Sequence, residues 1–274
     1  MRLKFISKTV HDAVFIMILV SLIAAAGRAQ ILNADRSAPG SDSAKSELHA
    51  FINLGLDINQ EEERVLKFKT SSEILYQFQK NVLILLSQYD ITSAENVKLI
   101  NAGYSHLRFR INRDARIQPE AFAQYQWNGV RGMKSRLLAG ANMRFQVKKD
   151  SLTSAYLAIG LMDERETWDY RSVPVEKVPL NAADRETDFV KLNSYVNLNR
   201  KLSPHVGAAF MVYLQARPNK NIVYPRISPL LNVNFRISRN LSMAMMFSGM
   251  YDRKPVVPIR KFFYDFSTAI NVRF

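Results

Sequence analysis

The sequence predicts an all-β fold, a 12-stranded antiparallel transmembrane β-barrel of the outer-membrane type. In about a dozen segments hydrophobic residues alternate with polar or small ones, which is the period of a β-strand. The first 29 residues have the pattern of an export signal. The chain also closes on an alternating segment, Phe263–Phe274, that ends in an aromatic residue. This combination is typical of outer-membrane barrels.

The N-terminal segment has the parts of a signal peptide. Basic residues at positions 2, 4 and 8 precede the apolar run Val14–Ala26, and Gly27–Ala29 supplies a small-x-small cleavage pattern. A helix needs about 20 residues to span the hydrocarbon of a membrane, and the apolar run is shorter than that. We therefore expect a signal peptide over residues 1–29 rather than a retained anchor.

Composition limits what the rest of the chain can be. Residues 30–45 are small and polar without a period, which predicts a flexible periplasmic tail before a barrel over residues 46–274. The absence of cysteine excludes disulfides, thiolate metal sites and a lipid-modified cysteine. The net charge of +14 lies mostly beyond residue 29. Behind an export signal, this charge favours anionic lipid headgroups or an anion-attracting lumen as partners, and not nucleic acid.

Twelve segments carry the alternation, and in each we expect every second residue to face lipid. An even number is usual in bacterial single-chain barrels, and it returns both ends of the chain to the periplasmic side. Val82–Leu86 is apolar throughout, which leaves the register of the third segment open. The expected outward rows span Leu48–Leu56, Leu66–Phe78, Val82–Leu86, Gly103–Ile111, Ala121–Trp127, Leu137–Phe145, Ala155–Leu161, Val190–Leu198, Val206–Leu214, Ile227–Phe235, Leu241–Phe247 and Tyr264–Phe274.

The connections are expected to differ in length between the two rims. Short turns on one rim and long loops on the other are usual in outer-membrane barrels, whereas a soluble β-sandwich has no reason to sort them. The expected turns follow even-numbered segments, at Gln79–Asn81, Asn112–Ala115, Lys148–Asp150, Lys201–Pro204 and Ser238–Asn240. The expected long loops follow odd-numbered segments, around residues 59–64, 90–96, 127–134, 164–188, 216–224 and 251–262.

Several strand motifs resemble those of a known family. They are His106–Arg110, Pro119–Gln124, Arg136–Phe145 and Tyr251–Pro255. They are similar to motifs of the outer-membrane barrel family called domain of unknown function 481, which includes proteins described as salt-induced outer-membrane proteins. The resemblance runs from about Ser46 to Phe274. It implies a barrel, and it brings no catalytic residues with it.

The histidines do not favour an enzyme. An outer-membrane hydrolase needs a nucleophile or water activated by a base at the outer rim. Beyond the signal the histidines are His49, His106 and His205, all expected between mid-wall and the periplasmic end. We interpret them as polar wall or turn residues, and we assign no catalytic residue, cofactor or metal site. A lipid-acting enzyme is the disfavoured third alternative.

Two other features have plain structural explanations. The acidic segment Glu164–Arg171 offers alternate carboxylates for a cation, but its arginines oppose one, which favours a strand end and a solvated loop. A set of aromatic residues near strand ends suggests sugar binding, yet an interfacial girdle is the usual explanation. That set is Tyr125, Trp127, Trp168, Tyr224, Tyr251 and Phe274.

The inward rows contain the candidate lumen residues. Charges inside a narrow barrel must be paired or hydrated, so they form either a closed polar plug or a constricted aqueous path. Arginines toward the periplasmic end have only Glu47 and Glu120 as obvious counter-charges, which would make an open lumen anion-selective. The candidates are His106, Arg108, Arg110, Glu120, Gln124, Arg136, Arg144, Glu164, Arg236 and Arg273.

The expected location is therefore the bacterial outer membrane, and two functions stay open. One is a small channel or ligand-holding barrel for polar or anionic solutes. The other is a structural envelope protein with a closed, salt-bridged lumen. Phe274 resembles the terminal aromatic of outer-membrane assembly signals, so the barrel assembly machinery is an expected partner.

Overall fold

The computed structural model describes residues 46–60, 63–95, 97–219 and 222–272, and these form one 12-stranded antiparallel sheet. The expected signal peptide, the expected tail, Arg273 and Phe274 lie outside the described residues. Each strand pairs with the next along the chain, so the order is β1 to β12 without a crossover. This confirms the predicted all-β, antiparallel, 12-stranded arrangement.

The strands are 11 to 19 residues long. Even the shortest therefore reaches the length of roughly 9 to 11 residues that a tilted membrane strand needs. Their bounds are β1 Glu47–Gln60, β2 Arg64–Phe78, β3 Asn81–Ala94, β4 Val97–Arg110, β5 Ile117–Asn128, β6 Met133–Lys149, β7 Thr153–Trp168, β8 Arg185–Ser203, β9 Val206–Ala216, β10 Arg226–Arg236, β11 Leu241–Asp252 and β12 Phe262–Val272.

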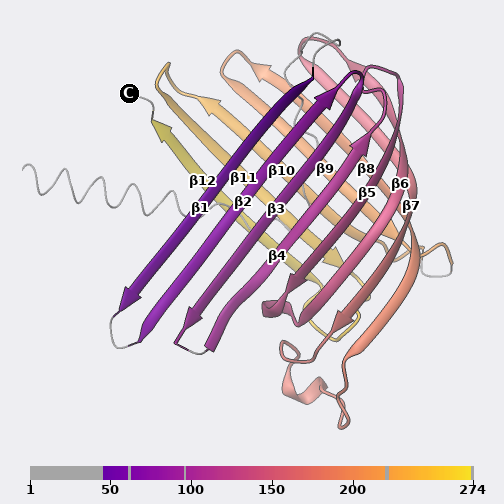
Figure 1. Cartoon of the computed structure of the whole chain (residues 1–274). Helices are drawn as coiled ribbons and strands as arrows, with labels where there is room; N and C mark the ends of the chain where they lie inside the picture. Colours follow the sequence, from indigo (N-terminus) through magenta and orange to yellow (C-terminus); the bar gives the residue numbers. More distant parts are fainter. Residues whose placement is uncertain (1–45, 61–62, 96, 220–221, 273–274) are drawn as a thin grey trace, which may run out of the picture.

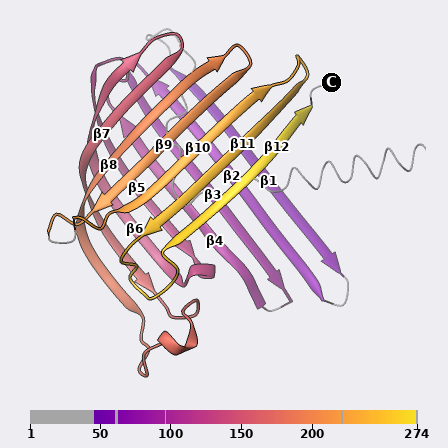
Figure 2. The ribbon, with the colours of Figure 1, turned by 180° about the vertical axis from the view of Figure 1, so that it is seen from behind.

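The sheet curls on itself. In Figures 1 and 2 the first strands lie opposite the last ones, with the bend running through β5–β8. Among the described residues no ladder joins β1 to β12, so the curl is open along the line between these two strands, which we call the seam. The structure thus shows a curled 12-stranded sheet, and the predicted closure into a barrel stays a prediction.

The curled sheet has two rims. The terminal rim, at the top of Figure 1, holds the start of β1, the end of β12 and the connections after even-numbered strands. The loop rim, at the bottom, holds the connections after odd-numbered strands. Within the described ranges, no helix is long and apolar enough to cross a membrane.

The predicted facing of the strands is confirmed where one face is buried. In β5 every second side chain from Gln118 to Gln126 is buried on the concave face, and the outward residues between them are exposed or half-buried. The open register of the third segment is also settled. Val82, Ile84 and Leu86 pack on the concave face against Leu75.

The sorting of loops by length is confirmed only in part. Residues 169–184, 217–225 and 253–261 are long connections on the loop rim. The long loops expected around 59–64 and 90–96 are wrong, because β1 runs to Gln60 and β3 runs to Ala94. Asp90 is not a loop residue but a buried concave-face side chain, with Lys69 at 3.9 Å.

Candidate functional site

The concave face of β4–β10 carries charged side chains that are almost fully buried. Arg108 is 2% exposed, Glu120 is 3% exposed and Glu164 is 1% exposed. Buried charges require partners, because removing them from water is costly. They are arranged in two clusters, one toward each rim.

The terminal-side cluster is built around the carboxylate of Glu120 on β5. Arg110 Nε donates to Glu120 Oε1 at 2.7 Å from the directly opposite position of β4. Arg108 lies 3.8 Å and Arg144 lies 3.9 Å from the same carboxylate. Tyr195 Oη on β8 donates to Glu120 Oε2 at 2.6 Å. Three arginines therefore share one carboxylate, which leaves the cluster positively charged.

Aromatic and amide groups complete the terminal-side cluster. Arg108 Nη2 donates to Tyr213 Oη at 3.2 Å, and its guanidinium lies 5.3 Å from the ring centre of Tyr195. The guanidinium of Arg144 lies 3.4 Å from the ring centre of Tyr156 and donates to Gln118 Oε1. Such cation–π contacts stabilise desolvated arginines that lack a full set of acidic partners.

The loop-side cluster contains Glu164 and Glu166, neighbouring inward residues of β7. Arg136 Nε donates to Glu164 Oε2 at 2.8 Å, and Lys191 Nζ donates to Glu164 Oε1. Arg226 on β10 reaches across the interior and donates to Glu166 Oε1 at 2.8 Å. Arg226 Nε also lies 3.0 Å from Asp252 Oδ2 on β11. With Asp252 included, three carboxylates face three cations, so this cluster is formally neutral.

Amide side chains extend from the loop-side cluster toward the terminal-side cluster. Arg136 Nη1 donates to Gln126 Oε1 at 3.1 Å, and Arg136 Nη2 donates to Gln215 Oε1 at 2.9 Å. Gln126 accepts from Gln124 at 2.6 Å, and Gln124 contacts His106 at 3.0 Å. The cavity left between the clusters is about 20 Å³, roughly room for a single water. A second cavity, of about 60 Å³, lies beside Glu166 and Arg226, so among the described residues the interior under β4–β10 leaves only small spaces at these two places.

The loop rim above the loop-side cluster is covered by an apolar cluster. It joins the ends of β6 and β7 to the long connections 169–184 and 253–261. Trp168 and Val257 are its buried centre, and Trp168 Nε1 donates to Glu166 Oε2 at 3.2 Å. We call this group the mouth cluster. Its buried members are Met133, Trp168, Val173 and Val257, with Tyr170, Val178, Val256 and Ile259 packed against them.

A second contact crosses the loop rim from β5–β6 to β12. The 3-10 turn Gly129–Arg131 ends on Gly132, whose φ of 76° is readily adopted only by glycine. The guanidinium of Arg131 lies 4.0 Å from the ring centre of Phe263. Burial, together with the charge of Arg226, lowers the pKa of Arg131 to about 10. The loop rim is thus bridged by polar as well as apolar contacts.

Most predicted lumen residues come together in these clusters. Of the predicted lumen residues, all those between His106 and Glu164 in the sequence are buried on the concave face. Arg236 is solvent-exposed at the terminal rim, and Arg273 lies outside the described residues. Glu47, the other expected counter-charge, instead lies 3.3 Å from His49 on β1. Sequence reasoning missed a set of partners whose inward positions follow the same alternation, namely Glu166, Lys191, Tyr195, Tyr213, Gln215, Arg226 and Asp252.

Two sequence interpretations are corrected here. The acidic segment 164–171 is a strand end followed by a loop, as expected, but β7 continues to Trp168 and both glutamates are buried instead of solvated. Trp168 is an inward residue of the mouth cluster, not part of an outward girdle, whereas Tyr125 and Trp127 do face outward, with tilted rings whose centres lie 5.8 Å apart. Tyr224 lies in a loop under Lys254, at 4.1 Å. Among the described residues no acidic or histidine group is arranged to hold a metal ion.

The comparisons with known proteins add little to this geometry. No family model matches the chain, and no curated protein matches it. A solved structure titled "NanC porin structure in rhombohedral crystal form" is similar, with a TM-score of 0.39 and 7% identity. The alignment covers 84% of this chain and 99% of that one. At this level the similarity says nothing about substrate or activity.

Proposed function

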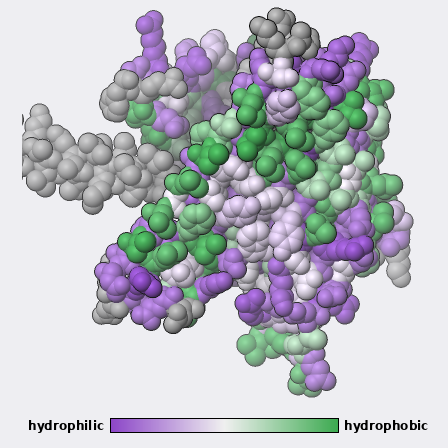
Figure 3. Space-filling view, viewed as in Figure 1, coloured by the Kyte–Doolittle hydropathy of each residue, from purple (hydrophilic) through white to green (hydrophobic). Residues whose placement is uncertain are grey.

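We propose that this protein is an outer-membrane β-barrel whose lumen is closed at rest. The proposal rests on the distribution of side chains between the two faces of the sheet. Apolar side chains lie outside and charged ones inside, which is the reverse of a water-soluble curled sheet. Leu137 and Ile159 face outward and are both 51% exposed, while Arg108 and Glu164 are buried inside. In Figure 3 hydrophobic side chains gather on the outer flank, and hydrophilic ones predominate toward the rims. An apolar exterior around a polar interior suits lipid.

Membrane insertion also implies closure of the seam. Both β1 and β12 present a strand edge without a partner among the described strands. Unpaired backbone groups cannot face hydrocarbon, so only closed sheets span a membrane. The even number of strands sets β1 and β12 antiparallel to each other. In the membrane we therefore expect them to pair.

The small size of the interior spaces supports a closed state. Beneath β4–β10 the described cavities are small, about 20 Å³ beside Arg108 and Arg136 and about 60 Å³ beside Glu166 and Arg226, and the mouth cluster packs at the loop-rim ends of β6 and β7. Passage of any hydrated solute under these strands would require ion pairs to separate. A role in the envelope that does not depend on free diffusion through the barrel fits this geometry better than an open pore.

A narrow solute path is the second candidate, and one observation favours it. The inward residues of β1 and β12 are exposed or half-buried, and the inward face of β12 is polar or small at Asp265, Ser267 and Ala269. In contrast to β4–β10, this side of the lumen is not packed. A path for small polar solutes would run along it after the seam closes.

Conductance in planar bilayers tests the closed state. The native protein should give no steady discrete steps, whereas Glu164→Gln should give openings, because Arg136, Lys191 and Arg226 would then lack their shared carboxylate and repel one another. Glu186→Gln, an exposed residue of the same rim, is the matched control and should remain silent. Steady conductance of the native protein would instead identify an open channel.

A further inference from the structure

A large hollow lies at the terminal rim, away from both charged clusters. Its volume is about 880 Å³, and it is lined by the ends of β8–β12 and by the turns between them. Asn234, Arg236, Ser242 and Asn271 belong to inward rows, so the hollow opens on the concave side of the sheet. A volume of this order holds a drug-sized solute.

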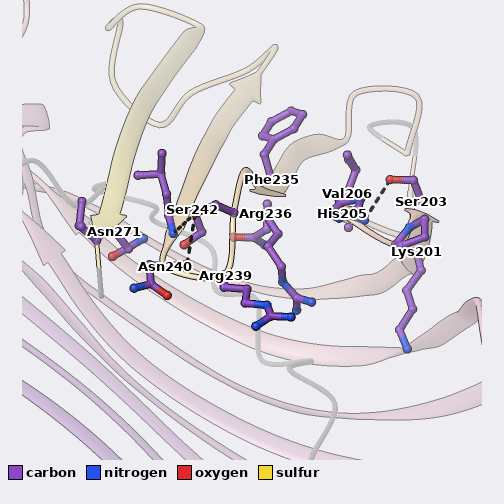
Figure 4. Close-up of a pocket in the computed structure, with 16 residues that line it drawn as sticks. Lys201, Ser203, His205, Val206, Phe235, Arg236, Arg239, Asn240, Ser242 and Asn271 are labelled. Carbon is purple, nitrogen blue, oxygen red and sulfur yellow. Dashed lines mark hydrogen bonds between the residues drawn. The ribbon is translucent and has the colours of Figure 1, made fainter. Parts of the chain in front are cut away.

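Three cationic side chains, Lys201, Arg236 and Arg239, line this hollow. In Figure 4 the side chains of Arg236 and Arg239 extend side by side, while Lys201 extends from β8 on the far side of His205, apart from the two arginines. His205 lies in the lining as well, and none of the sixteen lining residues is acidic. No ion pair joins Lys201, Arg236 or Arg239 to a carboxylate of the described residues. This differs from the loop-side cluster, where carboxylates match cations.

The turns that carry these cations are held by hydrogen bonds. The backbone N–H of Arg236 donates to His205 O at 2.7 Å, which fixes the β8–β9 turn against the end of β10. In the β10–β11 turn, Ser238 Oγ accepts from the N–H groups of Asn240 at 3.2 Å and Leu241 at 3.1 Å. The backbone of the turns that carry the cations is thus held before a ligand arrives, which lowers the backbone entropy lost on binding.

We propose that this hollow binds a small soluble solute that carries carboxylate or phosphate groups and hydroxyls. Uncompensated positive charge in a concave site raises the local concentration of anions. Guanidinium groups match the geometry of carboxylate and phosphate oxygens. Asn234, Ser242 and Asn271 supply neutral hydrogen-bonding groups beside them. Because the cations face the concave side, a solute in water is favoured over the headgroup of a surrounding lipid.

Binding is tested by calorimetry on the full chain in a neutral detergent, with citrate and tripolyphosphate as probes. The native protein should bind at least one of them, and added salt should weaken binding because screening reduces the attraction. Arg236→Glu with Arg239→Glu should weaken binding at least tenfold. Lys80→Glu with Lys149→Glu makes the same charge change at exposed positions of the same rim outside the hollow, and it should change binding less than twofold.

Three results would overturn the proposal. They are absence of binding to the native protein, equal loss in the two double variants, and preferential, arginine-dependent binding of phosphatidylglycerol in mixed micelles. If the double glutamate variant fails to fold, Arg236→Gln with Arg239→Gln replaces it. The measurement needs no membrane and no conduction. A silent bilayer therefore leaves this proposal intact, and loss of anion binding leaves the closed barrel intact.

Discussion

Tyr195 donates its hydroxyl hydrogen to the carboxylate of Glu120 at 2.6 Å, although β6 and β7 lie between their strands in the sheet. The bond therefore crosses the interior instead of following the wall. Arg226 makes the same kind of contact with Glu166, from β10 to β7. Such cross-ties fix the curvature of the sheet, which neighbouring-strand hydrogen bonds alone do not.

Tyr195→Phe removes one of these cross-ties and leaves the ring in place. A hydrogen bond to a charged group contributes about 1.5–3 kcal/mol, so the free energy of unfolding should fall by about that amount. Urea unfolding of the folded protein in detergent or lipid measures it. Tyr125→Phe, an outward and exposed tyrosine, is the control. Equal effects of both substitutions would show that the bond to Glu120 adds no stability.

The outward row is tested by Ile159→Arg. A lipid-facing arginine near the midplane costs about 2–4 kcal/mol, and Leu137→Arg should behave similarly. Ala269→Arg on the half-buried inward face of β12 should be tolerated. Inward positions of the packed half, such as Asn142 and Ala158, are unsuitable controls because they are buried. Similar folding yields for Ile159→Arg and Ala269→Arg would argue against lipid around the outward row.

The mouth cluster is tested by Val257→Asn, which buries an amide. Without a hydrogen-bond partner, a buried amide costs about 1–3 kcal/mol, so the connections 169–184 and 253–261 should separate more often. Limited trypsin digestion should then cleave faster at Arg171 and Lys177. Val175→Asn changes an almost fully exposed valine of the same connection and should leave the rate unchanged. Unchanged cleavage of Val257→Asn would mean that the two connections do not hold each other.

Closure of the seam is tested with cysteine pairs, which is direct because the chain has no native cysteine. Asn53→Cys on β1 is combined in turn with cysteine at each inward position of β12 from Phe263 to Asn271. One pair should form a disulfide in the membrane, since paired strands bring Cα atoms within about 4.4–6.8 Å. Asn53→Cys with Ser71→Cys, which are register partners, is the positive control. If only the control cross-links, the seam is open.

Strand number and facing could be predicted from the sequence because each depends on local alternation. The lengths of the loops that follow β1 and β3 on the loop rim could not be predicted from the sequence. Asp90 and Ser93 read as loop residues, yet Asp90 is an inward residue of β3 near Lys69. A polar residue inside a barrel strand looks the same in sequence as a polar residue in a turn. The resemblance to the family of unknown function 481 stays a prediction.

Partners inside the barrel were the least predictable part of the site. Alternation places Arg108 and Arg144 on the inner face, but it does not say that both lie beside Glu120. Contacts across the interior join residues far apart in the sequence, such as Arg108 and Tyr213, which are 105 positions apart. They depend on the curvature of the whole sheet. The sequence predicts unpaired arginines toward the periplasmic end of the lumen. Instead, three of these inward arginines share the carboxylate of Glu120.

The uneven distribution of cross-ties has a consequence for local stability. The buried cross-ties join β5 to β8 and β7 to β10, whereas β12 is reached from β5–β6 at the loop rim, where Phe263 contacts Arg131, and β1 pairs with β2 alone among the described strands. Regions with few buried contacts open at lower free energy than the global unfolding transition. Strands β1 and β12 should therefore separate from the sheet first. Their amide hydrogens should exchange with solvent before all others, and those of β5–β8 should exchange last. The packed half would then act as a preformed wall on which the seam strands open and close.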